Sequence, residues 1–219
     1  LRERMSADGY LFLPGLLPAH AVLDVRRQML EILAEAGMVR RDRPLDDAVA
    51  DLAHFAVEPE PAMMAVLRRQ CGLYDLNRLQ HRPELTGLFR ALFGEEALPL
   101  PWFVCRNIFP QRAAYTTPPH QDFVHIQGTE RNCAAWIPMG DCEEALGGLM
   151  VAEGTHRLGL LVFRPTLGAG GLEVVGDFEG RWRSGPFRAR DVLVHNCLTV
   201  HKAAPNQSGE RMRLSVDFR

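Results

Sequence analysis

The stretch RMRLSVDFR at residues 211–219 alternates polar and apolar side chains. In a β-strand successive side chains point to opposite faces, so the polar side chains of this stretch share one face. One face carries Arg211, Arg213, Ser215 and Asp217, and the other carries Met212, Leu214, Val216 and Phe218. The pattern predicts a strand whose polar face looks into a barrel and whose apolar face packs against helices.

Sequence patterns typical of β-strands continue N-terminally from this stretch as far as Trp102. Short runs rich in β-branched and aromatic residues are separated there by Gly, Pro and Asp. The runs are WFVCRNIF (102–109), NCAAWIP (132–138), GLMVA (148–152), LEVV (172–175), DVLVHN (191–196), LTVH (198–201) and RLSVDF (213–218). Short strands in succession, without alternating helices, favour a sandwich or a double-sheet jelly roll.

The first half of the chain is helical in its pattern. Residues 8–15 predict a short strand, residues 18–36, 62–69 and 83–93 predict helices, and residues 40–59 predict a loop with at most a short helix. We therefore expect one mainly β domain with flanking α-helices over residues 1–219. Its helical part, residues 1–100, would pack on one sheet of a double-stranded β-helix (jelly-roll, cupin-like) core at residues 101–219.

The composition limits the partners. The chain has 219 residues, is 24% charged with a formal net charge of -2, and contains no block rich in Lys and Arg. Nucleic acids and anionic membranes need concentrated positive charge, so neither is an expected partner. The five cysteines form no CxxC pair, and no apolar run reaches the ~18 residues of a membrane span. These features indicate a cytoplasmic protein with reduced thiols.

The stretch PPHQDFVH at residues 118–125 places His120 and Asp122 two residues apart. If it is a strand, the imidazole and the carboxylate point to the same face. Chance alone supplies about 0.4 such pairs in a chain of this composition, so the pair needs support from its surroundings. His201 is the candidate third ligand, because two histidines and one carboxylate form the facial set that holds non-haem Fe(II) with open positions.

An oxygenase of this type also needs a cation for its dicarboxylate cosubstrate. The planar guanidinium of arginine binds a carboxylate in bidentate geometry. Arg211 and Arg213 have the same strand parity, so alternation leaves both open.

Taken together, these motifs resemble the phytanoyl-CoA dioxygenase family of Fe(II)/2-oxoglutarate-dependent oxygenases. The residues that carry the resemblance are HQD at 120–122, the run around Trp136, GGL at 147–149, GTHR at 154–157, DVLV at 191–194 leading to His201, and RLS at 213–215. The resemblance implies that His120, Asp122 and His201 bind the iron.

The resemblance also implies a cosubstrate pocket. Arg213 would bind the distal carboxylate of 2-oxoglutarate with Ser215 beside it, and Trp136 would line the pocket. Family members often hold this arginine one position earlier, where this chain has Met212, so Arg211 remains the alternative. A small polar residue common two positions after the distal histidine is Ala203 here.

The activity implied is oxidation of a C–H bond in a small organic substrate, coupled to decarboxylation of 2-oxoglutarate to succinate and CO2 with O2 as oxidant. Related halogenases carry a small residue at the position of Asp122, so this chain is expected to be a hydroxylase. No cationic cluster matches a coenzyme A phosphate, which favours a free small molecule or a natural-product intermediate. The alternatives are a cupin-like metal-dependent hydrolase or isomerase and a non-catalytic jelly-roll binding module; the sequence sets no oligomeric state.

Overall fold

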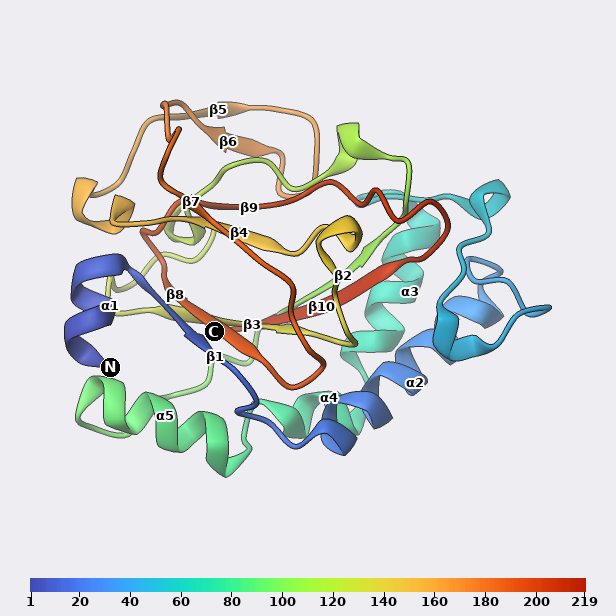
Figure 1. Ribbon diagram of the computed structural model, residues 1–219, viewed down its shortest axis with the longest axis horizontal. Helices are drawn as coiled ribbons and strands as arrows, with labels where there is room; N and C mark the ends of the chain where they lie inside the picture. The colour runs from blue at the N-terminus through green and yellow to red at the C-terminus, as the bar shows by residue number, and fades with distance from the viewer.

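The computed structural model describes all 219 residues and contains two facing antiparallel sheets (Figure 1). The larger sheet has the strand order β1-β8-β3-β10-β2. Its strands are β1 (Tyr10–Leu13), β2 (Val104–Ile108), β3 (Cys133–Pro138), β8 (Val192–Asn196) and β10 (Arg213–Phe218). The strand predicted at residues 213–218 is therefore confirmed, and it lies between β3 and β2 in the sheet.

The smaller sheet has the order β7-β4-β9. Its strands are β4 (Leu149–Ala152), β7 (Trp182–Arg183) and β9 (His201–Ala203), and a separate hairpin pairs β5 (Phe163–Pro165) with β6 (Leu172–Val174). A single bridge between His120 and His201 extends this sheet past β9. Two antiparallel sheets packed in this way form the predicted jelly roll.

Five α-helices accompany the sheets. They are α1 (Arg2–Asp8), α2 (Ala19–Glu35), α3 (Pro61–Cys71), α4 (Tyr74–Leu79) and α5 (Pro83–Phe93). The three predicted helices are α2, α3 and α5, whereas α1 and α4 are too short to show a readable apolar repeat. No helix has the length and apolar character needed to cross a membrane.

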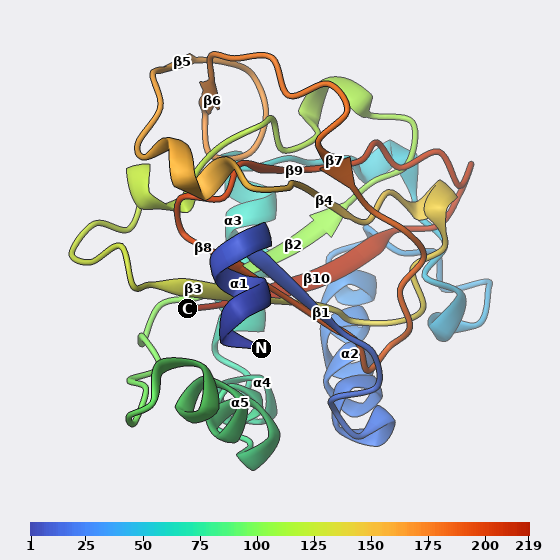
Figure 2. The same ribbon diagram turned by 60° about the vertical axis from the view of Figure 1, so that its left-hand side comes forward.

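The layers are visible in Figure 2, where α2, α4 and α5 lie below the five-stranded sheet and β4, β7 and β9 lie above it. A cluster of 33 buried apolar residues joins the helices to the lower face of that sheet, and a cluster of seven, around Trp136, lies between the two sheets. Because apolar burial is the dominant favourable term in folding, most of the stabilisation comes from the helix side. Besides the smaller apolar cluster, the space between the sheets contains polar side chains.

Two segments differ from the predicted strands. Residues 118–125 do not form a strand: only His120 pairs, through backbone hydrogen bonds of 2.9 and 3.0 Å with His201, and Asp122 begins a 3-10 turn, η4 (Asp122–Val124). Pro118 and Pro119 have no N–H to donate, so no ladder forms before His120. The predicted strand at residues 198–201 is also misplaced, because β9 begins at His201.

The predicted loop at residues 40–59 contains two short 3-10 turns, η1 (Leu45–Asp47) and η2 (Leu52–His54). It is tied to the sheet end by a bridge between Val49 and Arg211. The remaining 3-10 turns are η3 (Ala113–Tyr115), η5 (Glu144–Leu146) and η6 (Thr155–Leu158).

Candidate metal centre

The structure brings His120, Asp122 and His201 together between the two sheets. The Nε2 atoms of His120 and His201 each lie 3.7 Å from Oδ1 of Asp122, and one donor atom from each residue falls within 4.8 Å of the others. A separation of 3.7 Å is too long for a hydrogen bond. The three groups therefore converge on a shared point without bonding to one another, although a turn and not a strand places Asp122 beside His120.

The backbone sets the orientation of both imidazoles. The Nδ1 of His120 lies 2.9 Å from the carbonyl oxygen of Pro118, and the Nδ1 of His201 lies 3.0 Å from that of Thr199. A carbonyl can only accept, so each Nδ1 carries the proton and donates it. Each Nε2 is left with a free lone pair, the arrangement usual for metal-binding histidines.

Protonation does not compete for these lone pairs near neutral pH. Burial lowers the pKa of His120 and of His201 to about 3, so both imidazoles are neutral. Burial alone would raise the pKa of Asp122, but the guanidinium of Arg219 holds it well below its usual value. Two neutral nitrogen donors and one carboxylate fit the requirements of Fe(II).

Sequence reasoning missed Arg219. Its Nη2 lies 3.1 Å from Oδ1 and 3.0 Å from Oδ2 of Asp122, and the side chain of Arg219 is 95% buried. The alternation that puts Arg213, Ser215 and Asp217 on one face also puts Arg219, two residues after Asp217, on that face. The partner of Arg219 could not be predicted from the sequence, because the contact with Asp122 joins residues 97 positions apart.

The polar face of β10 carries the predicted cosubstrate residues. Arg213 is buried, and its Nη1 donates a 2.7 Å hydrogen bond to Oγ of Ser215. Its guanidinium lies 5.9 Å from the ring centre of Trp136, and its Nε is buried without a hydrogen-bond partner. Arg211 instead pairs with Glu143 at 3.1 Å on the surface. The structure therefore places Arg213 near the candidate metal centre and Arg211 away from it.

These groups line one cavity of about 290 Å³. Its walls combine the three candidate ligands with Trp136, Arg213 and Ala203 and with side chains from β2, β4 and β10. His195 is not in the wall; it packs behind His201, with ring centres 4.0 Å apart.

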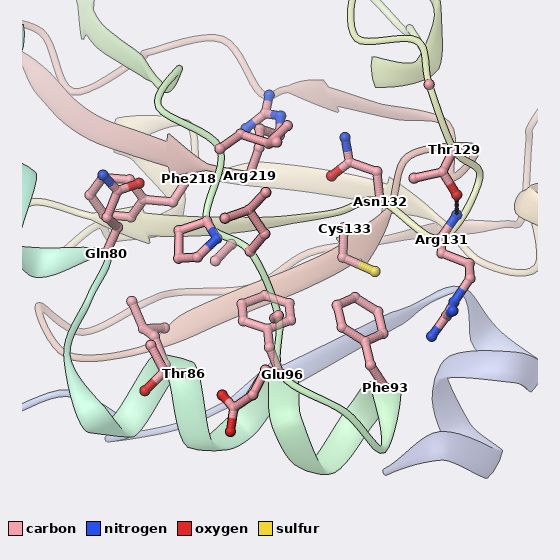
Figure 3. A pocket seen from close by; sticks show the side chains of 18 of the residues that line it. Gln80, Thr86, Phe93, Glu96, Thr129, Arg131, Asn132, Cys133, Phe218 and Arg219 are labelled. Carbon is pink, nitrogen blue, oxygen red and sulfur yellow. Dashed lines mark hydrogen bonds between the residues drawn. The ribbon is translucent and has the colours of Figure 1, made fainter.

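A larger cavity of about 420 Å³ lies elsewhere, between α5 and the ends of β3 and β10 (Figure 3). Its lining is mainly apolar, with Phe89, Phe93 and Phe218 among the side chains, and it contains no cluster of metal-binding groups. Arg219 lines both cavities. Of these two cavities, only the smaller is lined by the three candidate ligands.

A family model described as Phytanoyl-CoA dioxygenase (PhyH) matches residues 5–214. The chain belongs to the phytanoyl-CoA dioxygenase family. The resemblance found in the motifs is confirmed, and this member of the family is an enzyme of the Fe(II)/2-oxoglutarate-dependent oxygenases, with Fe(II), 2-oxoglutarate and O2 as its cofactors.

Two curated relatives of this phytanoyl-CoA dioxygenase family member are hydroxylases. A 1-deoxypentalenic acid 11-beta-hydroxylase from Streptomyces exfoliatus is 29% identical over 231 residues, which cover 96% of this chain and 76% of the relative. The corresponding hydroxylase from Streptomyces arenae is 28% identical over 230 residues, with the same coverage.

Solved structures share the fold across the whole chain. The epimerase SnoN, in complex with Fe3+, alpha ketoglutarate and nogalamycin RO, has a TM-score of 0.69 at 23% identity, covering 100% of this chain and 80% of its own. The carbocyclase SnoK from nogalamycin biosynthesis has a TM-score of 0.64 at 22% identity, covering 99% and 81%. At these identities the structural similarity establishes the fold alone. The two solved structures are an epimerase and a carbocyclase, so proteins with this fold carry out different reactions.

Proposed function

We propose that this protein is a dioxygenase that hydroxylates a C–H bond of a small organic substrate and decarboxylates 2-oxoglutarate to succinate and CO2. The observation that carries the proposal is the convergence of two neutral imidazoles and one carboxylate beside a buried arginine. In this proposal His120, Asp122 and His201 hold Fe(II). Bound iron would activate O2, which is the oxidant of the reaction.

Arg213 binds the distal carboxylate of 2-oxoglutarate in this proposal. Its guanidinium lines the same cavity as the candidate ligands, and its buried Nε has no partner within the protein. A buried unsatisfied donor costs about 1–3 kcal/mol, which a ligand carboxylate would offset. Ser215 holds the guanidinium in place, and Trp136 forms the wall beside it. The surface ion pair of Arg211 supports choosing Arg213.

Hydroxylation is preferred over other outcomes for two reasons. Asp122 occupies the position at which related halogenases have a small residue, so no ligand position is freed for a halide. The two curated relatives are named as hydroxylases of 1-deoxypentalenic acid, which supports oxidation of a small natural product here. The epimerase and carbocyclase structures show what other outcomes to test for.

The binding part of the proposal is tested without oxygen. Addition of Fe(II) and 2-oxoglutarate to the anaerobic protein is expected to produce a visible charge-transfer band. His120→Ala is the matched variant and is expected to lack the band. A wild-type protein without the band would count against 2-oxoglutarate binding at this site.

The catalytic part is tested by succinate release across a panel of small natural-product intermediates, followed by mass analysis of the products. A gain of one oxygen atom that requires both O2 and 2-oxoglutarate is the expected result. Turnover without any oxygen requirement would instead favour a metal-dependent hydrolase or isomerase, and failure to consume 2-oxoglutarate with any substrate would favour a binding module.

A further inference from the structure

The cavity that holds the candidate metal centre is lined by three carboxylates, Glu58, Asp122 and Asp217. Glu58 forms an ion pair with Arg106, and Asp122 forms one with Arg219. The side chain of Asp217 accepts no hydrogen bond and forms no ion pair, although Asp217 is only 8% exposed. Asp217 is thus the one carboxylate in the cavity wall without a partner in the protein.

The strand pairing fixes the position of Asp217 within the cavity. Asp217 lies on β10 between Arg213 and Arg219, opposite Val104 on β2 and Trp136 on β3. Its side chain therefore shares the inner face with the candidate cosubstrate residues. Burial raises the pKa of Asp217, as expected for a carboxylate that no nearby cation compensates fully.

A carboxylate that is largely buried without a partner in the chain is unfavourable, and Asp217 is reached from the cavity, so its position points to a partner that comes from outside the chain. The dicarboxylate cosubstrate does not suit this role, because its two negative charges repel Asp217 and are already matched by the metal and Arg213 in the proposed function. The substrate is the remaining partner. Arg106 pairs with Glu58 and Arg219 pairs with Asp122, so both guanidinium charges are already matched within the chain. Nε and Nη1 of Arg219 keep no hydrogen-bond partner, but a substrate carboxylate would still add a negative charge beside Asp217 without an unmatched positive charge to balance it.

The other side chains of the cavity wall indicate which skeleton such a substrate would have. Trp102, which is 50% exposed, lines the cavity together with Val104, Leu149 and Ala169. These side chains offer an apolar surface on one part of the wall, while Thr117, His125 and the ion-paired Arg106 and Arg219 belong to its polar part. The ligand that complements Asp217 together with the apolar part has a compact hydrocarbon skeleton with one hydrogen-bond donor.

We propose that Asp217 is a specificity-determining residue that accepts a hydrogen bond from a hydroxyl or ammonium group of the substrate, so that the site selects such molecules over the matching carboxylic acid. This inference rests on the proposed function, since it takes the cavity as the site of substrate oxidation.

Three probes with one skeleton test the selection: 1-adamantanamine, 1-adamantanol and 1-adamantanecarboxylic acid. Their affinities for the enzyme loaded with Fe(II) and 2-oxoglutarate are measured by calorimetry without oxygen. For the wild type, the amine and the alcohol are expected to bind at least tenfold more tightly than the acid. In Asp217→Asn the amine is expected to lose at least tenfold in affinity, while the acid does not weaken.

Two further readouts separate this role from others. The charge-transfer band with 2-oxoglutarate reports the proposed function by itself: a wild type without it fails that function, whereas a band present in both proteins leaves only the role of Asp217 in question. The thermal midpoint of Asp217→Asn without ligands is expected to equal or exceed that of the wild type, because an uncompensated buried charge is removed. The control is Asp24→Asn, which changes an exposed carboxylate on α2.

Equal affinities for the three probes, or an order unchanged by Asp217→Asn, would overturn the proposal. So would a tenfold change in 2-oxoglutarate affinity in that variant, which would assign Asp217 to the cosubstrate. A large drop in thermal midpoint would assign it to folding.

Discussion

The two faces of β10 are equally buried but differ in what surrounds them. Leu214, Val216 and Phe218 on the outer face belong to the apolar cluster shared with the helices. The inner face carries Arg213, Ser215 and Asp217, of which Arg213 keeps an unpaired buried nitrogen. The outer face therefore stabilises the fold, whereas the inner face retains costly polar groups that are suited to ligands.

The neighbouring strand β8 shows the same division. Val192 and Val194 join the helix-side cluster, while Leu193 packs between the sheets and His195 lies against His201. One strand of the five-stranded sheet thus contributes both to the apolar core on the helix side and to the surroundings of the candidate metal centre. Substitutions on the two faces are expected to separate stability from ligand binding.

The largest effect is expected from His120→Ala, which removes a candidate ligand at the cavity. Succinate formation is expected to fall by about 10³-fold or more, because the metal carries the chemistry. The free energy of unfolding of the metal-free protein is expected to change by only about 1 kcal/mol, since the side chain is partly exposed. Metal analysis and urea titration measure the two effects, and full turnover in this variant would remove His120 from the ligand set.

Leu214→Ala tests the opposite face. The side chain is 2% exposed in the helix-side cluster, so its truncation is expected to lower the free energy of unfolding by about 2–5 kcal/mol. The folded fraction is expected to keep its charge-transfer band with Fe(II) and 2-oxoglutarate. Loss of the band without loss of stability would contradict the division between the two faces.

Arg213→Leu and Arg211→Leu form a matched pair on one strand face. Arg213→Leu is expected to weaken 2-oxoglutarate binding roughly 10- to 100-fold, because a hydrogen bond to a charged group contributes about 1.5–3 kcal/mol. Arg211→Leu, which removes only a surface ion pair, is expected to leave the affinity unchanged within about twofold. Titration of the charge-transfer band measures both, and the reverse order would transfer the role to Arg211.

The smallest of these effects is expected from Arg219→Gln. Arg219 contacts both oxygens of Asp122, and its loss is expected to weaken metal binding by about tenfold, the lower end of the effect usual for such a partner. Calorimetric titration with Fe(II) under anaerobic conditions measures the change. The control is Arg131→Gln, an exposed arginine paired with Glu95, which is expected to bind metal like the wild type.

The sequence by itself determined the elements with strong local patterns. The alternation at residues 213–218 predicted β10 and its two faces, and the apolar repeats predicted α2, α3 and α5. The motif around His120 and the distant His201 indicated the candidate ligands, because their residue types and family pattern are readable along the chain. These features depend on short-range periodicity or on motif identity, which a single sequence displays.

Only the tertiary structure decided how the site is assembled. Asp122 lies in a 3-10 turn that local pattern did not indicate, and its contact with Arg219 joins distant segments. Arg213 and Arg211 have the same strand parity, so only the position of Glu143 and the cavity distinguishes them. The unpaired state of Asp217 likewise depends on which cations Glu58 and Asp122 occupy. Parity in a strand gives the face of a side chain, but its partner depends on segments that only the fold brings into contact.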